Sequence, residues 1–159
     1  MKLRRIRPDE HERAGDVCVA AYKPFLTGAE DDYADRLHDV ARRDAEAEVW
    51  VAVEGDRLLG LVTYCPPRSP WREIGRGEEG EFRMLSVDPA AQGAGAGTAL
   101  ARLCEERARE DGATGMALSS LATMTAAHRV YARLGYARDP GRDWSPLPGV
   151  QLLAFSKVL

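Results

Sequence analysis

The sequence predicts a single domain of mixed α/β class, and three observations carry this prediction. The chain has 159 residues, of which 45% are hydrophobic and 30% charged, as expected for one globular domain with its own core. The hydrophobic pattern changes from a helical period to alternation near residue 49. From residue 81 onward apolar strands alternate with helices, and no internal repeat interrupts that order. We therefore expect one domain over residues 1–159.

The N-terminal part predicts one strand and two helices. Residues 3–6 form a short strand, and Pro8 with the acidic residues after it suits a helix start. Pro24 ends that helix. In the acidic segment that follows, apolar residues such as Leu37 and Val40 recur at helical spacing. We expect this segment to form a second amphipathic helix.

The next segment predicts an antiparallel hairpin followed by a long loop. Residues 49–53 and 58–64 are rich in valine and leucine, and the turn between them contains Gly55. Residues 66–80 hold three prolines and three glycines, which is typical of a loop. Loops of this length in a compact domain are often functional.

The C-terminal half predicts strands and helices in alternation. A strand over residues 81–87 ends at a break formed by Asp88 and Pro89. The other expected elements are a helix over residues 98–110 that ends before Gly112, a strand over residues 116–121, a helix capped by Thr123 or Thr125 that runs to Leu134, and a last strand over residues 150–159.

Composition and charge exclude several classes of function. The formal net charge of −3 lacks the positive field that nucleic-acid binding requires. No apolar run approaches the roughly 20 residues of a membrane-spanning helix, and no apolar stretch follows the basic N-terminus as a secretory signal would require. We expect a cytoplasmic protein without a membrane or nucleic-acid partner. Cys18, Cys65 and Cys104 lack the spacing that holds zinc, so we expect buried thiols and no metal.

A glycine-rich turn between a strand and a helix is the main functional signal. Its small residues leave little side chain between the backbone and a ligand, so that consecutive N–H groups can converge on phosphate oxygens. The helix that follows directs its positive end to the same point. The turn therefore predicts a phosphate site, although a flexible turn without a ligand is an alternative on these residues alone. It comprises Gln92, Gly93, Ala94, Gly95, Ala96, Gly97 and Thr98.

Two common nucleotide-binding motifs do not fit this turn. A Walker loop ends in Gly-Lys-Ser or Gly-Lys-Thr, and no lysine stands here. A dinucleotide-binding turn has the spacing GxGxxG, whereas Gly93, Gly95 and Gly97 give GxGxG, with Thr98 where the last glycine would stand. Neither a Walker site nor a dinucleotide site is predicted.

The turn and its flanks resemble the GNAT superfamily of N-acetyltransferases. In that family a strand ending in V-x-P precedes [Q/R]-x-x-G-x-[G/A]. Here Val-Asp-Pro at residues 87–89 is followed by Gln92, Gly95 and Gly97. The family's second motif, A-x-x-x-Y-x-x-x-G-[F/Y], is similar to AHRVYARLGY at residues 127–136. Two motifs in register identify the family more specifically than either motif alone.

The resemblance covers residues 58–136 and implies both a fold and a cosubstrate. The fold would be a mostly antiparallel central sheet with splayed middle strands, flanked by about four helices. Acetyl-CoA would lie between the splayed strands, with its pyrophosphate on the glycine turn and the acceptor amine entering from the other side. The backbone N–H of Leu85 would face the thioester oxygen, and Val87 would pair with the pantetheine.

Further positions at the cofactor follow from the same resemblance. They are Ser86, Met124, Ala127 and Tyr131. One of them departs from the family pattern, because the family often has asparagine seven positions before the motif tyrosine, where this chain has Met124. This departure weakens one contact with pantetheine.

Acyl transfer to an amine needs an uncharged nucleophile and therefore a route for its proton. An alkylamine with a pKa of about 10.4 is neutral about once in 2,500 molecules at pH 7, so its deprotonation costs about 4.6 kcal/mol. Glu81 matches the base glutamate of one branch of the family; a water chain is one alternative, and a solvated loop end beside Glu78 and Glu79 is another. By resemblance Tyr131 would protonate the departing thiolate. A core tyrosine on an amphipathic helix is the alternative reading of Tyr131.

Taken together, the residues and the resemblance predict an N-acetyltransferase that moves an acetyl group from acetyl-CoA to a primary amine of a small molecule, by direct attack in a ternary complex. A catalytically idle acyl-CoA sensor or regulatory module is the first alternative, and an enzyme acting on a protein or peptide is the second. The resemblance is also compatible with a homodimer that pairs through sheet edges or C-terminal strands. No motif defines the acceptor. Glu30, Asp31, Asp32 and Asp35 would suit a cationic amine or form a solvated helix face.

Overall fold

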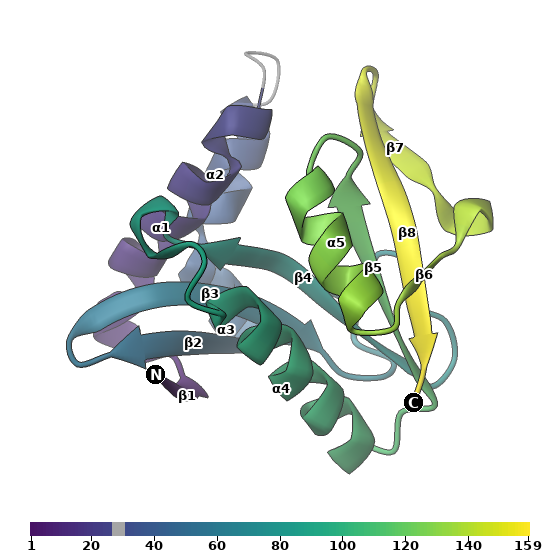
Figure 1. The fold of residues 1–159 in the computed structure, drawn as a ribbon, viewed down its shortest axis with the longest axis horizontal. Coiled ribbons are helices and arrows are strands. Elements are labelled where there is room, and N and C mark those ends of the chain that lie inside the picture. Colours follow the sequence, from purple (N-terminus) through teal and green to yellow (C-terminus); the bar gives the residue numbers. More distant parts are fainter. Residues whose placement is uncertain (27–30) are drawn as a thin grey trace. The chain divides into compact units, whose positions relative to one another are not determined.

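The computed structural model describes residues 1–26 and 31–159, and the chain divides into two compact units. The first unit comprises residues 1–64 and 84–101, and the second comprises residues 65–83 and 102–159. The described residues form five α-helices and eight strands, mostly antiparallel (Figure 1). The predicted mixed α/β class is therefore confirmed. None of the described helices is long and apolar enough to cross a membrane.

The sheet of the first unit is built from the N-terminal strand and the predicted hairpin. β1 pairs antiparallel with β2, and β2 with β3, so the three strands lie side by side (Figure 1). The hairpin turn contains Gly55 in the left-handed conformation, with φ of +58°. Val49, Val51 and Leu61 are fully buried and belong to the core of this unit. The strands are β1 (Lys2–Arg5), β2 (Glu48–Glu54) and β3 (Arg57–Cys65).

The helices of the first unit correct one prediction. The segment expected to form one amphipathic helix forms two, because Asp39 leaves the helical conformation and its carboxylate accepts the N–H of Arg42 at 3.3 Å. Asp39 is thus an N-cap inside the predicted helix. Glu30 and the side chains of Asp31 and Asp32 lie outside the described part of the chain. The helices are α1 (His11–Tyr22), α2 (Asp31–His38) and α3 (Val40–Glu46).

The second unit is organised around β5, which pairs with strands on both of its edges. It pairs in parallel with the first residues of β4 and antiparallel along its whole length with β8. Two short strands, β6 and β7, also pair with β8 and were not predicted. The strands are β4 (Glu79–Val87), β5 (Gly115–Leu121), β6 (Ala137–Arg138), β7 (Trp144–Leu147) and β8 (Val150–Val158).

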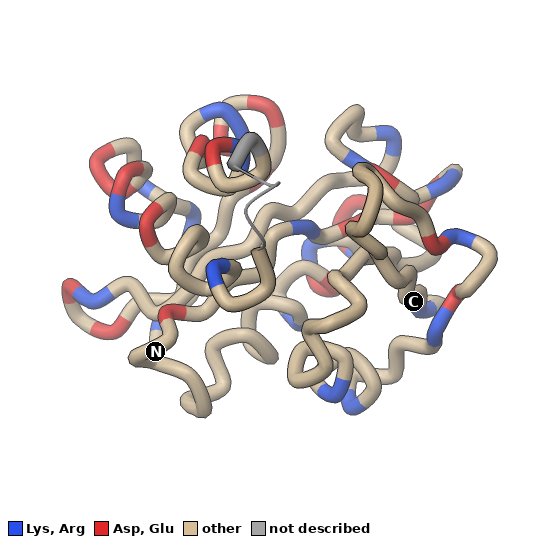
Figure 2. Tube along the Cα trace, turned by 90° about the horizontal axis from the view of Figure 1, so that it is seen from above, with Lys and Arg blue, Asp and Glu red and all other residues tan. Residues whose placement is uncertain are grey.

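The two remaining helices begin close to the predicted positions. α4 (Ala96–Glu110) starts two residues earlier than expected, and α5 (Thr125–Arg133) is preceded by Met124 as its N-cap. The side chain of Met124 makes no capping hydrogen bond, so the predicted threonine cap is wrong. Charged residues of both signs are spread along the Cα trace (Figure 2), consistent with the small net charge.

A half-buried ionic cluster joins three segments of the second unit. Glu105, on α4, has a side chain that is only 6% exposed and accepts two hydrogen bonds from Lys157 Nζ, at 3.1 and 3.0 Å. Lys157, on β8, also donates to the Leu134 carbonyl at the C-terminal end of α5, at 2.7 Å, and lies 5.6 Å from the centre of the Tyr136 ring. One ammonium group therefore compensates a buried carboxylate and an orphan helix carbonyl.

We expect Lys157→Met to lower the free energy of unfolding by about 2 kcal/mol, because the change keeps the apolar stem but leaves Glu105 without its closest cation. Urea denaturation would measure this loss. Lys2→Met is the matched control, because Lys2 is exposed on β1, and it should change the same quantity by less than about 0.5 kcal/mol. Equal midpoints and slopes for Lys157→Met and the unaltered protein would contradict the role given to the cluster.

Candidate functional site

The glycine turn lies wholly within the first unit and is built by local hydrogen bonds. The N–H of Asp88 donates to the Leu59 carbonyl on β3 at 2.8 Å, and the Asp88 carboxylate accepts the N–H of Ala90 at 3.0 Å. A single 3₁₀ turn (Pro89–Ala91) follows. Gly93 and Gly95 then take left-handed conformations, with φ of +87° and +85°. The chain thereby reverses and enters α4 at Ala96.

The backbone of this turn faces open space at two of its glycines. A Cβ atom added at Gly93 or Gly95 would meet no atom within 4 Å, so the backbone is openly accessible. The N–H groups of Ala96, Gly97 and Thr98 belong to the first turn of a 15-residue helix, where no intrahelical acceptor is available. Residues 89–101 contain no charged side chain. Anion binding here would depend on backbone N–H groups and the helix dipole.

The backbone of β4 is irregular at Met84, next to Leu85, whose N–H is predicted to face the thioester. Met84 has φ of +53°, a left-handed conformation that is uncommon for a residue with a side chain. Within a strand such a residue is typical of a β-bulge, which interrupts the hydrogen-bond ladder. The buried hydroxyl of Ser86 donates to the Met84 carbonyl at 3.1 Å, so its side chain is directed inward. Leu85 and Val87 are half-buried.

Gly60 on β3 is required by this irregular segment. A Cβ added at Gly60 would lie 2.6 Å from the carbonyl oxygen of Ser86 and 3.4 Å from the Cα of Val87. Both atoms belong to the backbone, so neither can move away as a flexible side chain would. A glycine inside a strand pattern is the one sequence signal that could have indicated this close approach.

Tyr131 lies in the second unit within a cluster of aromatic rings. Its ring is 5.9 Å from Phe82, 6.2 Å from Tyr136 and 5.6 Å from Phe155, between ring centres, and only 5% of the residue is exposed. Burial raises the pKa of the Tyr131 hydroxyl above its ordinary value. The hydroxyl therefore stays protonated near neutral pH and can act only as a proton donor or neutral hydrogen-bond partner.

Met124 and Ala127 stand near Tyr131 along the chain. Ala127 is four residues before Tyr131, which places the two on one face of α5. Both Met124 and Ala127 are half-buried. The predicted site residues thus form two groups, one in each unit: the end of β4 with the glycine turn in the first, and Glu81 with the α5 residues in the second.

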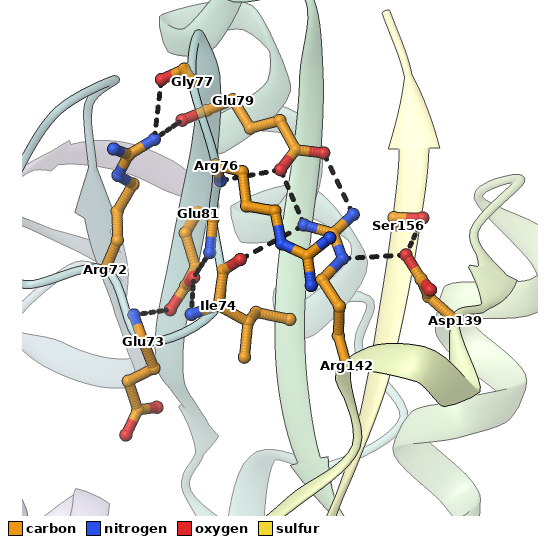
Figure 3. A network of polar contacts seen from close by, with 11 residues as sticks. Arg72, Glu73, Ile74, Arg76, Gly77, Glu79, Glu81, Asp139, Arg142 and Ser156 are labelled. Carbon is orange, nitrogen blue, oxygen red and sulfur yellow. Dashed lines mark hydrogen bonds and ion pairs between the residues drawn. The ribbon is translucent and has the colours of Figure 1, made fainter.

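Glu81 is fully buried beneath the loop that precedes β4, and its carboxylate accepts three backbone N–H groups (Figure 3). The donors are Glu73 at 2.8 Å to Oε2, and Ile74 at 2.9 Å and Gly75 at 2.7 Å to Oε1. Burial raises the pKa of Glu81, while these hydrogen bonds and the nearby Arg83 oppose the rise. Most of the accepting capacity of this carboxylate is therefore already used by the loop.

Arg142 holds the same loop from the C-terminal part of the chain (Figure 3). Its guanidinium donates to the Ile74 carbonyl at 3.2 Å and to the Glu79 carboxylate at 2.6 and 3.1 Å, and it pairs with Asp139 at 2.8 Å. These carboxylates raise the pKa of Arg142. Burial opposes ionisation of Glu79, yet the bonds from Arg142 and the Arg76 backbone lower its pKa overall.

Two further arginines that the sequence did not single out also bind this loop. Arg72 Nη1 donates to the carbonyls of Gly77 and Glu79, both at 2.9 Å. Arg83 Nη1 donates to the Trp71 carbonyl at 3.0 Å. No motif marks these arginines, because the carbonyls that accept these three hydrogen bonds belong to the backbone, which any sequence offers.

Comparison with known proteins identifies the family and the fold. A profile of the acetyltransferase (GNAT) family matches residues 12–136. A mycothiol acetyltransferase from Cellulomonas flavigena is 36% identical over 112 residues, which cover 65% of this chain and 32% of that protein. This chain therefore spans about a third of the length of that relative.

Solved structures show the same fold. An acetyltransferase of the GNAT family from Staphylococcus aureus has a TM-score of 0.76 and 13% identity, covering 99% of this chain and 98% of that chain. A GNAT family acetyltransferase from Brucella melitensis, solved in complex with acetyl-CoA, has a TM-score of 0.62 and 26% identity, covering 99% and 90%. The fold predicted from the two motifs is confirmed.

We expect Gly60→Ala to lower the free energy of unfolding by about 2 kcal/mol, because the added methyl would overlap the Ser86 carbonyl and force the backbone of β4 to shift. Urea denaturation would measure the loss, and amide chemical shifts at Ser86 and Val87 should report the displacement. Gly97→Ala is the control: its methyl would lie 3.4 Å from a Val87 side-chain atom, an ordinary contact, within a helix that favours alanine. A larger loss for Gly97→Ala than for Gly60→Ala would contradict the packing described.

Proposed function

Because the chain belongs to the acetyltransferase (GNAT) family, we propose that it transfers the acetyl group of acetyl-CoA to a primary amine of a small molecule. The open glycine turn at the start of α4 is the observation that carries this proposal. The relative from Brucella melitensis that binds acetyl-CoA supports the cosubstrate. The name of the mycothiol acetyltransferase supports a small-molecule acceptor. The cytoplasmic location and the homodimer remain predictions from the sequence.

The proposed cofactor site uses backbone groups of the first unit. The N–H groups of the turn and of the first turn of α4 would bind the pyrophosphate, with Gln92 and Ala94 beside it. The backbone of Leu85 would donate to the thioester oxygen as negative charge develops there, and Val87 would pair with the pantetheine. The left-handed Met84 supports this assignment, because a bulge frees backbone groups that a regular ladder would use.

The proposed chemistry is a direct transfer. Acetyl-CoA supplies a thioester whose carbonyl carbon accepts the lone pair of a neutral amine. As the N–C bond forms and the C–S bond breaks, Tyr131 would donate its proton to the sulfur and later recover one that the amine has released. Its raised pKa supports a group that arrives protonated. The proton of the amine would leave through Glu81 or through a chain of waters. The water route is favoured, because three backbone N–H groups already occupy the Glu81 carboxylate.

The function is tested by incubating the protein with acetyl-CoA and a panel of primary amines while free thiol is followed. Thiol release that depends on one class of amine would support the proposal. Tight acetyl-CoA binding without release on any amine would favour the idle sensor, and release only with peptides would favour a protein acetyltransferase. The absence of acetyl-CoA binding would refute all three functions.

We expect Gly95→Ala to weaken acetyl-CoA binding at least about tenfold, because a left-handed alanine is strained by roughly 1 kcal/mol and its methyl would enter the open space over the turn. Isothermal titration calorimetry would measure the affinity. Gly112→Ala is a matched control, since Gly112 has φ of +76° and equally open surroundings but stands outside the turn. Both variants should lose similar stability, and only Gly95→Ala should lose affinity. Equal affinities in the two variants would remove the turn from the cofactor site.

We expect Tyr131→Phe to lower kcat about tenfold to a hundredfold with acetyl-CoA affinity mostly retained, because the ring packing survives and only the proton donor is removed. Tyr136→Phe is the matched control. Tyr136 is equally buried and contacts the Tyr131 ring, but has no assigned role in the reaction. Steady-state thiol release should show normal turnover for Tyr136→Phe. The same turnover in Tyr131→Phe would exclude an acid role.

A further inference from the structure

Residues 71–75 of the loop before β4 are bound along one face of that strand by two charged side chains. We propose that Glu81 and Arg83 are positioning residues, which hold residues 71–75 as a fixed wall that selects the acceptor, and that Glu81 does not take the proton of the amine. This inference rests on the proposed function, because it assigns the wall to the acceptor side of that reaction.

The contacts of Glu81 argue for an anchor. A carboxylate offers about four lone-pair positions, and three are occupied here by the N–H groups of Glu73, Ile74 and Gly75. A general base must reach the acceptor directly or through one water. Glu81 is fully buried, and the backbone of residues 73–75 is bonded directly to its oxygens. Proton abstraction would require the loop to leave first.

Arg83 is the second anchor, two residues along the same strand and hence on the same face. Its Nη1 donates to the Trp71 carbonyl at 3.0 Å, its Nε forms an ion pair with Glu73 at 3.1 Å, and its guanidinium carbon lies 5.5 Å from the centre of the Trp71 ring. Arg83 thus holds the first residues of the segment, and Glu81 holds the last.

The rest of the loop is bound from other directions, which makes the wall rigid. Arg72 closes the following turn through the carbonyls of Gly77 and Glu79. Ile74 is bound through both of its backbone polar groups: its N–H donates to Glu81, and its carbonyl accepts a hydrogen bond from Arg142. A loop with this many charge-assisted bonds is ordered before any ligand arrives, and pre-organised walls discriminate between ligands better than mobile ones.

The two roles of Glu81 are separated by comparing Glu81→Gln with Glu81→Ala. The glutamine carbonyl can keep the bonds from Ile74 and Gly75, which share Oε1, but its NH₂ group cannot accept the N–H of Glu73. If Glu81 is an anchor, Glu81→Gln should therefore still hold residues 73–75 in part, whereas Glu81→Ala should not hold them. As a base, both variants would be equally inactive, because neither glutamine nor alanine takes a proton.

Amide hydrogen exchange of the protein without ligand tests the anchor independently of activity. We expect exchange at residues 73–75 to rise about tenfold in Glu81→Gln and about a hundredfold in Glu81→Ala. In steady-state kinetics the acceptor KM should rise about threefold in Glu81→Gln and at least about tenfold in Glu81→Ala. The kcat of Glu81→Gln should stay within about threefold of that of the unaltered enzyme. A hundredfold loss of kcat that is equal in both variants, with unchanged KM and unchanged exchange, would overturn the proposal.

Arg83→Met provides a second test that keeps the carboxylate and does not depend on the folding of Glu81→Ala. It should raise exchange at residues 71–73 and the acceptor KM while leaving kcat nearly unchanged. The matched control is Arg109→Met, since the Arg109 side chain is 53% exposed on α4, and it should change neither quantity. Unchanged acceptor KM in both Arg83→Met and Glu81→Gln would also overturn the proposal. If the unaltered protein binds no acetyl-CoA, both the proposed function and the selection of the acceptor by residues 71–75 are refuted. The exchange data still show whether Glu81 and Arg83 hold these residues in place.

Discussion

The burial of the Glu81 carboxylate is the constraint on which the arrangement of the second unit depends. A carboxyl group removed from water must be compensated by hydrogen bonds, since a buried polar or charged group without partners is costly. Here the compensation comes from three consecutive N–H groups, which reach the carboxylate because residues 73–75 lie directly against it. The path of residues 73–75, which form no regular structure, is therefore fixed by Glu81 in the first half of β4.

Arginine extends the same principle to segments that lack regular structure. A guanidinium carries five donors in a planar fork, so that one side chain can bind carbonyls and carboxylates from different parts of the chain at once. Arg142 does this for the loop, Glu79 and Asp139, and Arg72 for the two ends of one turn. Without such cross-links, loops rich in proline and glycine would have to be ordered by packing alone, and few of their residues are apolar.

The sequence predicted those features that depend on local pattern. Alternation predicted the hairpin of β2 and β3, apolar runs predicted β4, β5 and β8, and the glycine spacing predicted the turn before α4. What it missed depends on contacts distant in sequence or on backbone conformation. No sequence signal marks the left-handed conformation of Met84. The short strands β6 and β7 are defined by their pairing with β8, which a local pattern does not predict. The break at Asp39 could have been recognised as an N-cap, since aspartate competes with helical hydrogen bonds.

Glu81 shows what a strand pattern leaves open. The sequence predicts the strand that carries Glu81, but nothing in it tells which polar groups lie against the Glu81 carboxylate. The proposed binding of the cofactor by backbone N–H groups in an uncharged turn depends on glycine conformation and places little demand on side chains. In the proposed reaction the acceptor would then be chosen elsewhere, by a part of the chain held rigidly enough to distinguish one amine from another. The proposed wall meets that requirement, because Glu81 and Arg83 on β4 and Arg142 from the C-terminal part of the chain all bind its backbone.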